Sequence, residues 1–159
     1  MTSDRRTPSD RHELARRSAE AMLGDDRVSA GLGMELLDVA PGTSRLRMTV
    51  RDDMVNGHGI AHGGFVFALA DSAFAVACNT HGVVTVAAGC DITFAAPALL
   101  GDVLVAEAVE TDVFGRSGST DVRVTRESDG RLIAIFRGRS RSLGRPIPGV
   151  ETVAAEEKS

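Results

Sequence analysis

The sequence predicts an α+β fold in which one antiparallel sheet wraps around a single long central helix. Residues 65–79 are almost wholly apolar and rich in Ala, a strong helix former. Several other stretches, one before this helix and four after it, have the composition or alternation of strands. Because a helix that is apolar on nearly all sides must be buried, the strands are expected to form a concave sheet around it.

Length and composition are those of one globular domain. The 159 residues suffice for one core and are too few for two ordinary domains. Apolar residues make up 43% and charged residues 25%, which argues against a disordered chain. The net charge is −4 and there is no Trp or Tyr, so neither electrostatics nor stacking favours a nucleic-acid partner.

The elements before the apolar helix are expected in this order. Residues 1–11 are polar and are predicted to form a flexible arm, whereas residues 12–23 have apolar positions near helical spacing and are predicted to form a surface helix. Residues 28–37 contain two glycines and are compatible with a loop or a broken turn. Ser44–Arg51 alternates apolar and polar residues, which predicts a strand.

The elements after the helix are four strands and a tail. The strands are expected at Val83–Ala95, Asp102–Phe114, Ser119–Glu127 and Arg131–Arg141. Asp129 and Gly130 favour a hairpin turn between the last two. Residues 145–159 contain two prolines and a Glu-rich end and are predicted to be a flexible tail, so the domain is expected to span residues 12–144.

The sequence also predicts the compartment. Cys78 and Cys90 lie in apolar runs and are expected to be reduced core thiols in a cytoplasmic protein. The first residues contain no apolar segment typical of a secretory signal. The longest apolar stretch has 14 residues with Asp71 in its middle, too short and too charged to span a bilayer. We therefore expect no membrane partner.

Asp71 is the most informative single residue. An ionised carboxylate on an apolar helix is energetically costly unless it is paired or faces a water-filled cleft. The small neighbours Ala70, Ser72 and Ala73 leave room for a small-molecule cleft on that face. The alternatives are an Asp on a solvent-facing line of the helix or one that caps a neighbouring loop.

A loop rich in glycine and histidine, residues 56–64, precedes the helix. Its four glycines allow backbone N–H groups to approach a ligand, and the free N–H groups of the helix start point into the loop. This pattern favours an oxyanion site for a carbonyl oxygen, although a tight loop that only needs glycine to turn is the alternative.

Two other site types are not favoured. His58 and His62 would share a face only in a helix, which the surrounding glycines disfavour, so no metal site is expected. Ser72 adjoins Asp71 on the helix and therefore faces another side, so a Ser-His-Asp triad is rejected.

The loop and the helix together resemble the hotdog-fold acyl-CoA thioesterases, in particular those of phenylacetic-acid degradation. The resemblance rests on the run MVNGHGIAHGG at residues 54–64 and on ADSAFA at residues 70–75. Asp91-Ile92-Thr93-Phe94 with Pro97, and the run FRGRS at residues 136–140, fit the same family. It covers roughly residues 28–144 and implies a hotdog fold, in agreement with the element order derived above.

The resemblance implies a role for each residue of the motif. Asp71 matches the family's catalytic carboxylate, which acts as a general base on water or as a nucleophile through an anhydride. Gly63 or Gly64 would supply the backbone N–H that polarises the thioester carbonyl. Asn56 would orient the water or the thioester, and His62 would shape the loop. No cofactor is implied, because coenzyme A enters as part of the substrate.

Further residues are candidates for contact with substrate. Phe65 and Phe74 could line an acyl pocket, with a place in the core as the alternative. Near Ala87, where some relatives have a hydroxyl that helps to hold the attacking water, this chain has only Val86-Ala87-Ala88. Candidates for the coenzyme A phosphates, with a solvent-facing strand position as the alternative, are Arg116, Arg137, Arg139 and Arg141.

Helix geometry predicts that the site is shared between subunits. If Gly63 opens the helix, Asp71 lies roughly 12 Å further along its axis, at about 1.5 Å per residue. Both cannot touch one thioester, because reacting atoms must lie within about 3–3.5 Å of each other. We therefore expect a homodimer in which one subunit supplies the carboxylate and the other the N–H donor. The resemblance implies the same, usually as a homotetramer of two dimers.

Three functions are compared on this basis. The leading one is an acyl-CoA thioesterase, with (hydroxy)phenylacetyl or related aryl or medium acyl groups implied by the resemblance. A non-catalytic acyl-CoA-binding hotdog protein is the second, and the costly Asp71 argues against it. A hotdog dehydratase or hydratase is the third, and it would need His62 and Asp71 to serve as an acid–base pair.

Overall fold

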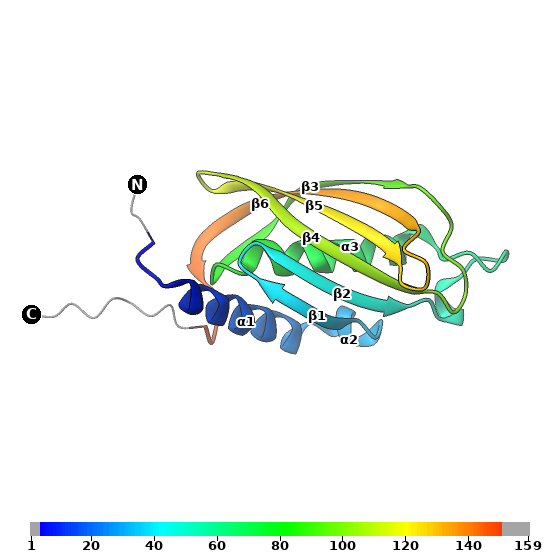
Figure 1. The fold of residues 1–159 in the computed structure, drawn as a ribbon, viewed down its shortest axis with the longest axis horizontal. Helices are drawn as coiled ribbons and strands as arrows, with labels where there is room; N and C mark the ends of the chain where they lie inside the picture. The colour runs from blue at the N-terminus through cyan, green and yellow to red at the C-terminus, as the bar shows by residue number, and fades with distance from the viewer. Residues whose placement is uncertain (1–3, 151–159) are drawn as a thin grey trace, which may run out of the picture.

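The computed structural model describes residues 4–150 of the chain, which form one curved sheet around a helix (Figure 1). Residues 1–3 of the predicted arm and residues 151–159 of the predicted tail lie outside the described residues.

Six antiparallel strands make up the sheet, in the order β1-β2-β4-β5-β6-β3. The strands are β1 Glu35–Ala40, β2 Thr43–Thr49, β3 Val83–Phe94, β4 Val103–Phe114, β5 Ser117–Arg126 and β6 Leu132–Pro146. β3 precedes β4 in sequence but lies at the far edge, because it pairs with β6 from Val83↔Pro146 to Phe94↔Ala134. One side of β3 is therefore not paired with any described strand.

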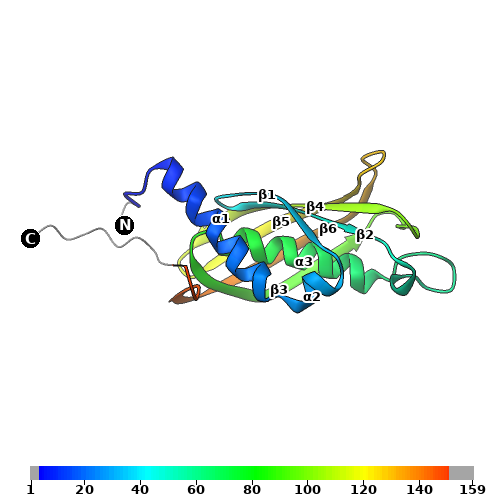
Figure 2. The ribbon, with the colours of Figure 1, turned by 90° about the horizontal axis from the view of Figure 1, so that it is seen from below.

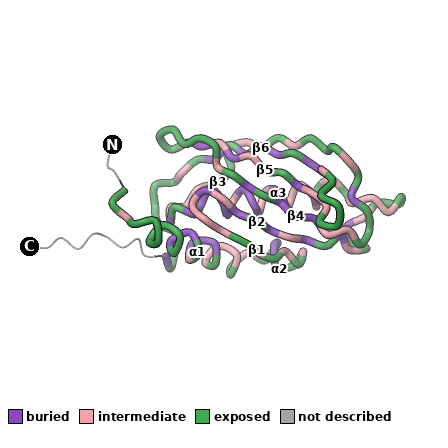
Figure 3. The backbone as a smooth tube through the Cα atoms, in the orientation of Figure 1, coloured by how far each residue is buried: buried purple, intermediate pink, exposed green. Residues whose placement is uncertain are grey.

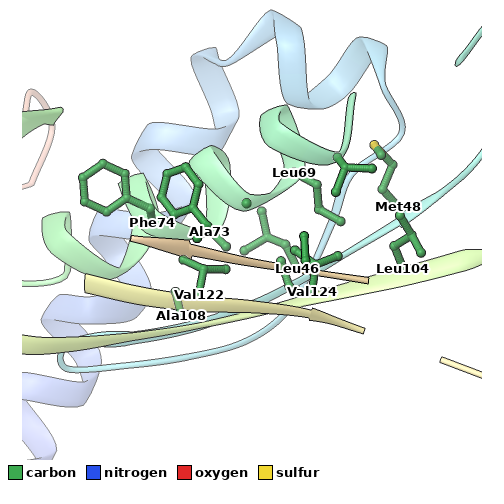
Figure 4. Close-up of a cluster of buried hydrophobic side chains, with 14 of the residues drawn as sticks. Leu46, Met48, Leu69, Ala73, Phe74, Leu104, Ala108, Val122 and Val124 are labelled. Atoms are coloured by element: carbon green, nitrogen blue, oxygen red, sulfur yellow. The ribbon is translucent and has the colours of Figure 1, made fainter. Parts of the chain in front are cut away.

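The central helix α3, Gly63–Asn79, lies along the inner face of the sheet (Figure 2). Residues along β2, β5 and β6 alternate between buried and less buried positions, so only one face of this part of the sheet is in the core (Figure 3). The core between helix and sheet contains Leu69 and Phe74 of α3 together with Leu46, Leu104 and Val122 (Figure 4). The predicted α+β fold, with a sheet wrapped around one apolar helix, is confirmed.

The N-terminal helix α1 runs from Pro8 to Asp25, so it begins before the predicted start at residue 12. Thr7 and Asp10 form a capping box, in which Thr7 Oγ1 accepts a hydrogen bond from Asp10 N at 3.1 Å and Asp10 Oδ2 accepts one from Thr7 N at 2.9 Å. Pro8 at the first helical position reinforces this start. The prediction of a flexible arm was therefore wrong for residues 8–11.

Residues 28–37, predicted as a loop or a broken turn, contain regular structure. A short helix α2, Arg27–Gly31, is capped by Asp26, and β1 begins at Glu35. A further short 3-10 helix, Asp52–Met54, follows β2.

The predicted tail is also partly structured. β6 continues to Pro146, beyond the expected end at residue 141, and Ile147 N then donates a hydrogen bond to Gly82 O at 3.0 Å. Ile147 and Val150 are buried with Leu14 of α1 in a small second cluster. The flexible-tail prediction was therefore wrong for residues 145–150, because apolar burial against α1 holds this segment.

None of the helices formed by residues 4–150 is long and apolar enough to cross a membrane. Cys78 is buried and Cys90 half-buried, and both are free thiols. The cytoplasmic location stays a prediction.

Candidate active site

The loop before α3 is held by Asn56. Its side-chain Oδ1 accepts hydrogen bonds from His58 N at 2.9 Å and Ile60 N at 3.2 Å, and its backbone N donates to Ile60 O at 2.8 Å. The carboxamide oxygen of Asn56 is thus used to fold the loop. Asn56 is exposed, and its Nδ2 group has no hydrogen-bond partner among residues 4–150, so Nδ2 is the part of Asn56 that is free to meet a ligand.

His62 is the N-cap of α3. Its Nδ1 accepts a hydrogen bond from Gly64 N at 3.0 Å, so the ring shapes the start of the helix. Gly64 N–H is therefore occupied, whereas Gly63 N–H has no partner within the described part of the chain. Of the two glycines named from the sequence, Gly63 is the one whose N–H is free to polarise a carbonyl oxygen.

An apolar cavity of about 430 Å³ opens beside the start of α3. Its walls include Ile60, Gly63, Val66, Phe94, Pro97 and Ile133. The Phe94 ring lies over Gly63, where a Cβ atom would be only 2.8 Å from Phe94 Cζ. Glycine is therefore needed for this close approach, and the volume is in the usual range for a small-molecule pocket, about 300–1,000 Å³.

Asp71 lies near the middle of α3 and is half-buried. It forms no hydrogen bond or ion pair with any residue in the range 4–150, so the interpretation of Asp71 as a loop cap is not supported. Burial, and secondly the negative charge of Asp26, raise the pKa of its carboxyl group above the ordinary value of 3.8. A carboxylate with a raised pKa is a stronger base, which is useful for taking a proton from water.

The aromatic candidates separate into two kinds. Phe74 is 1% exposed and packs against Phe136, with ring centroids 5.8 Å apart, and it also contacts Gly138. It belongs to the core, as the alternative interpretation had it, and not to a substrate surface. Phe65 is half-buried near the loop, with its ring edge-on to His62 at 6.2 Å. Ala87 is exposed on the edge strand β3, beside a register shift between Ala87 and Gly89.

The arginine candidates are exposed, and three of them, Arg137, Arg139 and Arg141, follow one another at every second position of β6. Arg137 is committed to Asp121 through two hydrogen bonds of 2.7 and 3.1 Å, and Arg139 lies 3.6 Å from Asp91. Arg116 sits in the turn after β4 and forms no ion pair with any described residue. Arg137 and Arg139 alternate along β6 with the buried Phe136 and Gly138, so they lie on the outer face of the sheet.

Two residues of the site were not expected from the sequence. Phe94 stood out only as part of a motif, and its contact with Gly63 depends on β3 running past the start of α3. Asp26 was not singled out, although Asp before a short helical stretch is a recognised N-cap signal. In residues 4–150, no group of three or more His, Cys, Asp or Glu side chains is arranged to hold a metal ion.

Comparisons with known proteins match most of the chain. Residues 58–133, which include His62, Gly63 and Asp71, match the family described as Thioesterase superfamily. The acyl-coenzyme A thioesterase PaaI of Escherichia coli K12 is 37% identical over 132 residues, covering 83% of this chain and 94% of that protein. Human acyl-coenzyme A thioesterase 13 is 33% identical over 101 residues, covering 62% of this chain and 72% of that protein.

The fold comparison agrees with the sequence comparison. The structure of the E. coli PaaI protein from the phenylacetic acid degradation operon superposes with a TM-score of 0.83 at 36% sequence identity. The superposition covers 85% of this chain and 97% of that one.

Proposed function

The chain belongs to the thioesterase superfamily and is an acyl-CoA thioesterase of the PaaI type with a hotdog fold, and on this premise we propose that Asp71 drives the hydrolysis. The observation that supports this role is its half-buried carboxylate, without hydrogen-bond or ion-pair partners among residues 4–150, on a helix that is otherwise apolar. A binding protein would have no use for so unfavourable a group beside a thioester.

The proposed chemistry begins with a water molecule next to Asp71. Asp71 takes a proton from the water while the water oxygen bonds to the thioester carbonyl carbon. The carbon–sulfur bond then breaks, and the proton passes to the coenzyme A thiolate, which leaves a free acid and coenzyme A. In the variant route, the Asp71 carboxylate bonds to the carbonyl carbon, the carbon–sulfur bond breaks, and coenzyme A leaves as its thiolate. Water then cleaves the mixed anhydride, which regenerates Asp71, releases the free acid and supplies the proton that the thiolate takes up. Neither route needs a cofactor, because coenzyme A is part of the substrate.

We propose that Gly63 N–H is the donor to the carbonyl oxygen. Gly64 N–H is engaged by His62, and the positive end of the α3 dipole adds to the field at this point. Asn56 would use its free Nδ2 group to orient the water or the thioester, while His62 holds the loop. A single donor of this kind contributes roughly 10²–10³ in kcat in other enzymes.

The apolar cavity beside Gly63 is proposed to take the acyl group. Its walls are apolar and its volume suits a phenylacetyl or hydroxyphenylacetyl group, or a medium acyl chain. Phe65 would lie at the edge of this region. Arg116 and Arg139 are the better candidates for the coenzyme A phosphates, because Arg137 would first have to release Asp121.

The proposed enzyme is a homodimer with shared sites, assembling further into a homotetramer. Gly63 and Asp71 are eight residues apart on one helix, so a single chain does not bring both to one thioester. The edge strand β3 offers an unpaired side, a natural template for a second copy. Ala87 lies on this strand and would line the shared site.

Hydrolysis of a panel of aryl-acetyl and straight-chain acyl-CoA thioesters tests the proposal. We expect wild type to release thiol from phenylacetyl-type substrates, and Asp71→Asn to lose about 10²–10⁴-fold of that rate. Asp112→Asn, the same change at an exposed carboxylate on β4, should keep full activity. Binding without thiol release would instead favour the non-catalytic acyl-CoA-binding function. A fully active Asp71→Asn would remove Asp71 from its role.

A further inference from the structure

Hydrogen bonds between three side chains, those of Asp26, Ser29 and Ser72, connect α2 to α3, the helix that carries Asp71. Asp26 caps α2, and its Oδ1 accepts hydrogen bonds from Val28 N at 2.9 Å and Ser29 N at 3.1 Å. Its Oδ2 accepts from Ser29 Oγ at 2.6 Å. Ser29 Oγ in turn lies 3.2 Å from Ser72 Oγ on α3. Ser29 is only 3% exposed, so this connection lies inside the protein.

The number of hydroxyl protons determines which group donates in each of these hydrogen bonds. Ser29 has one hydroxyl proton and uses it in the short bond to Asp26, so in the bond between the two serines Ser72 must be the donor. The Ser72 proton therefore points away from Asp71, its neighbour in sequence. Three donors converge on the Asp26 carboxylate, and within residues 4–150 no donor reaches Asp71.

Two carboxylates with opposite environments thus lie beside the same stretch of α3. The Asp26 carboxylate accepts three hydrogen bonds, whereas Asp71 accepts none within residues 4–150 and is therefore free to exchange a proton with water. We propose that Asp26 is a positioning residue for the reaction, whose negative charge, held against α3 through Ser29 and Ser72, keeps Asp71 a strong base. This inference rests on the proposed function of Asp71.

The other groups near Asp71 do not offset this charge. Burial, with a smaller contribution from the charge of Asp71, raises the pKa of the Cys90 thiol on β3 and of the Cys78 thiol on α3, that of Cys78 to about 12. Both thiols are therefore uncharged at neutral pH. Arg139 and Asp91 lie on the outer face of the sheet, where they face each other at 3.6 Å. Within residues 4–150, Asp26 is the charged neighbour that contributes, after burial, to the raised pKa of Asp71.

The sign of the expected effect follows from like-charge repulsion. With Asp26 ionised, Asp71 keeps its proton to a higher pH and is a stronger base once it has lost it. Removing the charge of Asp26 makes Asp71 ionise at a lower pH and weakens it as a base. The acidic limb of the kcat/KM profile reports this ionisation in the free enzyme.

The test compares two neutral substitutions. Asp26→Asn removes the charge but keeps a good N-cap, since Asn caps helices about as well as Asp. Asp25→Asn makes the same change at the exposed neighbour and serves as the matched control. We expect Asp26→Asn to move the acidic limb to lower pH and to lower kcat at the plateau far less than Asp71→Asn does. Asp25→Asn should leave both unchanged.

A direct titration separates this inference from the proposed function. The ¹³C signal of the Asp71 carboxyl group, assigned by its loss in Asp71→Asn, should titrate at lower pH in Asp26→Asn than in wild type. Ser29→Ala, which breaks the link and removes one of the three donors to Asp26 but keeps both carboxylates, should move the signal in the same direction by less. If Asp71→Asn is inactive but neither limb nor signal moves in Asp26→Asn, the inference is wrong and the role of Asp71 stands. If Asp71→Asn is fully active, the proposed function fails and the positioning role fails with it.

Discussion

Replacing Gly138 with Ala should destabilise the fold strongly, although the change adds only one methyl group. Gly138 lies on the inner face of β6, where the new Cβ would sit 2.6 to 2.7 Å from three atoms of the Phe74 ring. Carbon atoms in contact prefer about 3.5–4.0 Å, so the ring would have to retreat by about 1 Å. It has no free space to do so, because Phe74 is 1% exposed and rests on Phe136.

The magnitude follows from the cost of overpacking a dense core. Such insertions cost about 1–3 kcal/mol, and the hard contact with an immobile ring places Gly138→Ala near about 3 kcal/mol. At about 2–4 °C per kcal/mol for a chain of this size, Tm should fall by about 6–12 °C. Urea unfolding and thermal melting of the purified protein measure the two quantities.

A double-mutant cycle identifies the ring as the cause. Phe74→Leu removes the ring atoms that the methyl group would meet, so the double variant should lose clearly less free energy of unfolding than the two single losses added together. Gly24→Ala is the control, because nothing lies within 4 Å of a Cβ at that helical position. It should gain about 0.5–1 kcal/mol. Additive losses in the cycle, or a Tm for Gly138→Ala equal to that of wild type, would refute the reasoning.

Two further predictions concern Asp71 and the C-terminal segment. Because the folded-state pKa of Asp71 is raised above its ordinary 3.8, the folded protein binds that proton more tightly and loses stability as pH rises through the folded-state pKa. Asp71→Asn should therefore be more stable than wild type at pH 7 by chemical unfolding, with a gain that shrinks towards pH 3; an equal gain at both pH values contradicts this. Ile147→Ala should cost about 2 kcal/mol by removing most of the buried contact with Leu14, whereas Pro148→Ala, at an exposed position, should change little in the same urea titration.

Much of the fold could be predicted because its signals are local. The apolar composition of α3 and the alternation in β2 each indicate their own structure without help from the rest of the chain. The start of α1 was missed because it depends on two side chains, Thr7 and Asp10, that cap it from outside the periodic pattern. β1 was missed because none of its side chains is fully buried and its pairing with β2 shifts register near Leu36.

The candidate site could also be predicted only in part. The loop and Asp71 could be named as candidates because their residue types differ from those around them, and this difference is visible in the sequence alone. The free N–H of Gly63, as opposed to Gly64, follows only from the direction of the His62 ring. The closeness of Phe94 to Gly63, and the charge of Asp26 near Asp71, arise from packing between distant segments and have no signal in local sequence.

The strand order has a consequence for synthesis on the ribosome. α3 is complete before β4, β5 and β6, which cover it, have been made, and β3 must wait for β6 before it finds its partner. At about 5–20 residues per second, the 67 residues from Thr80 to Pro146 take roughly 3–13 s to appear. For those seconds the nascent chain carries an almost wholly apolar helix with only part of its sheet, which is the kind of segment that chaperones shield. Slower induction and lower expression temperature should accordingly raise the yield of correctly folded protein.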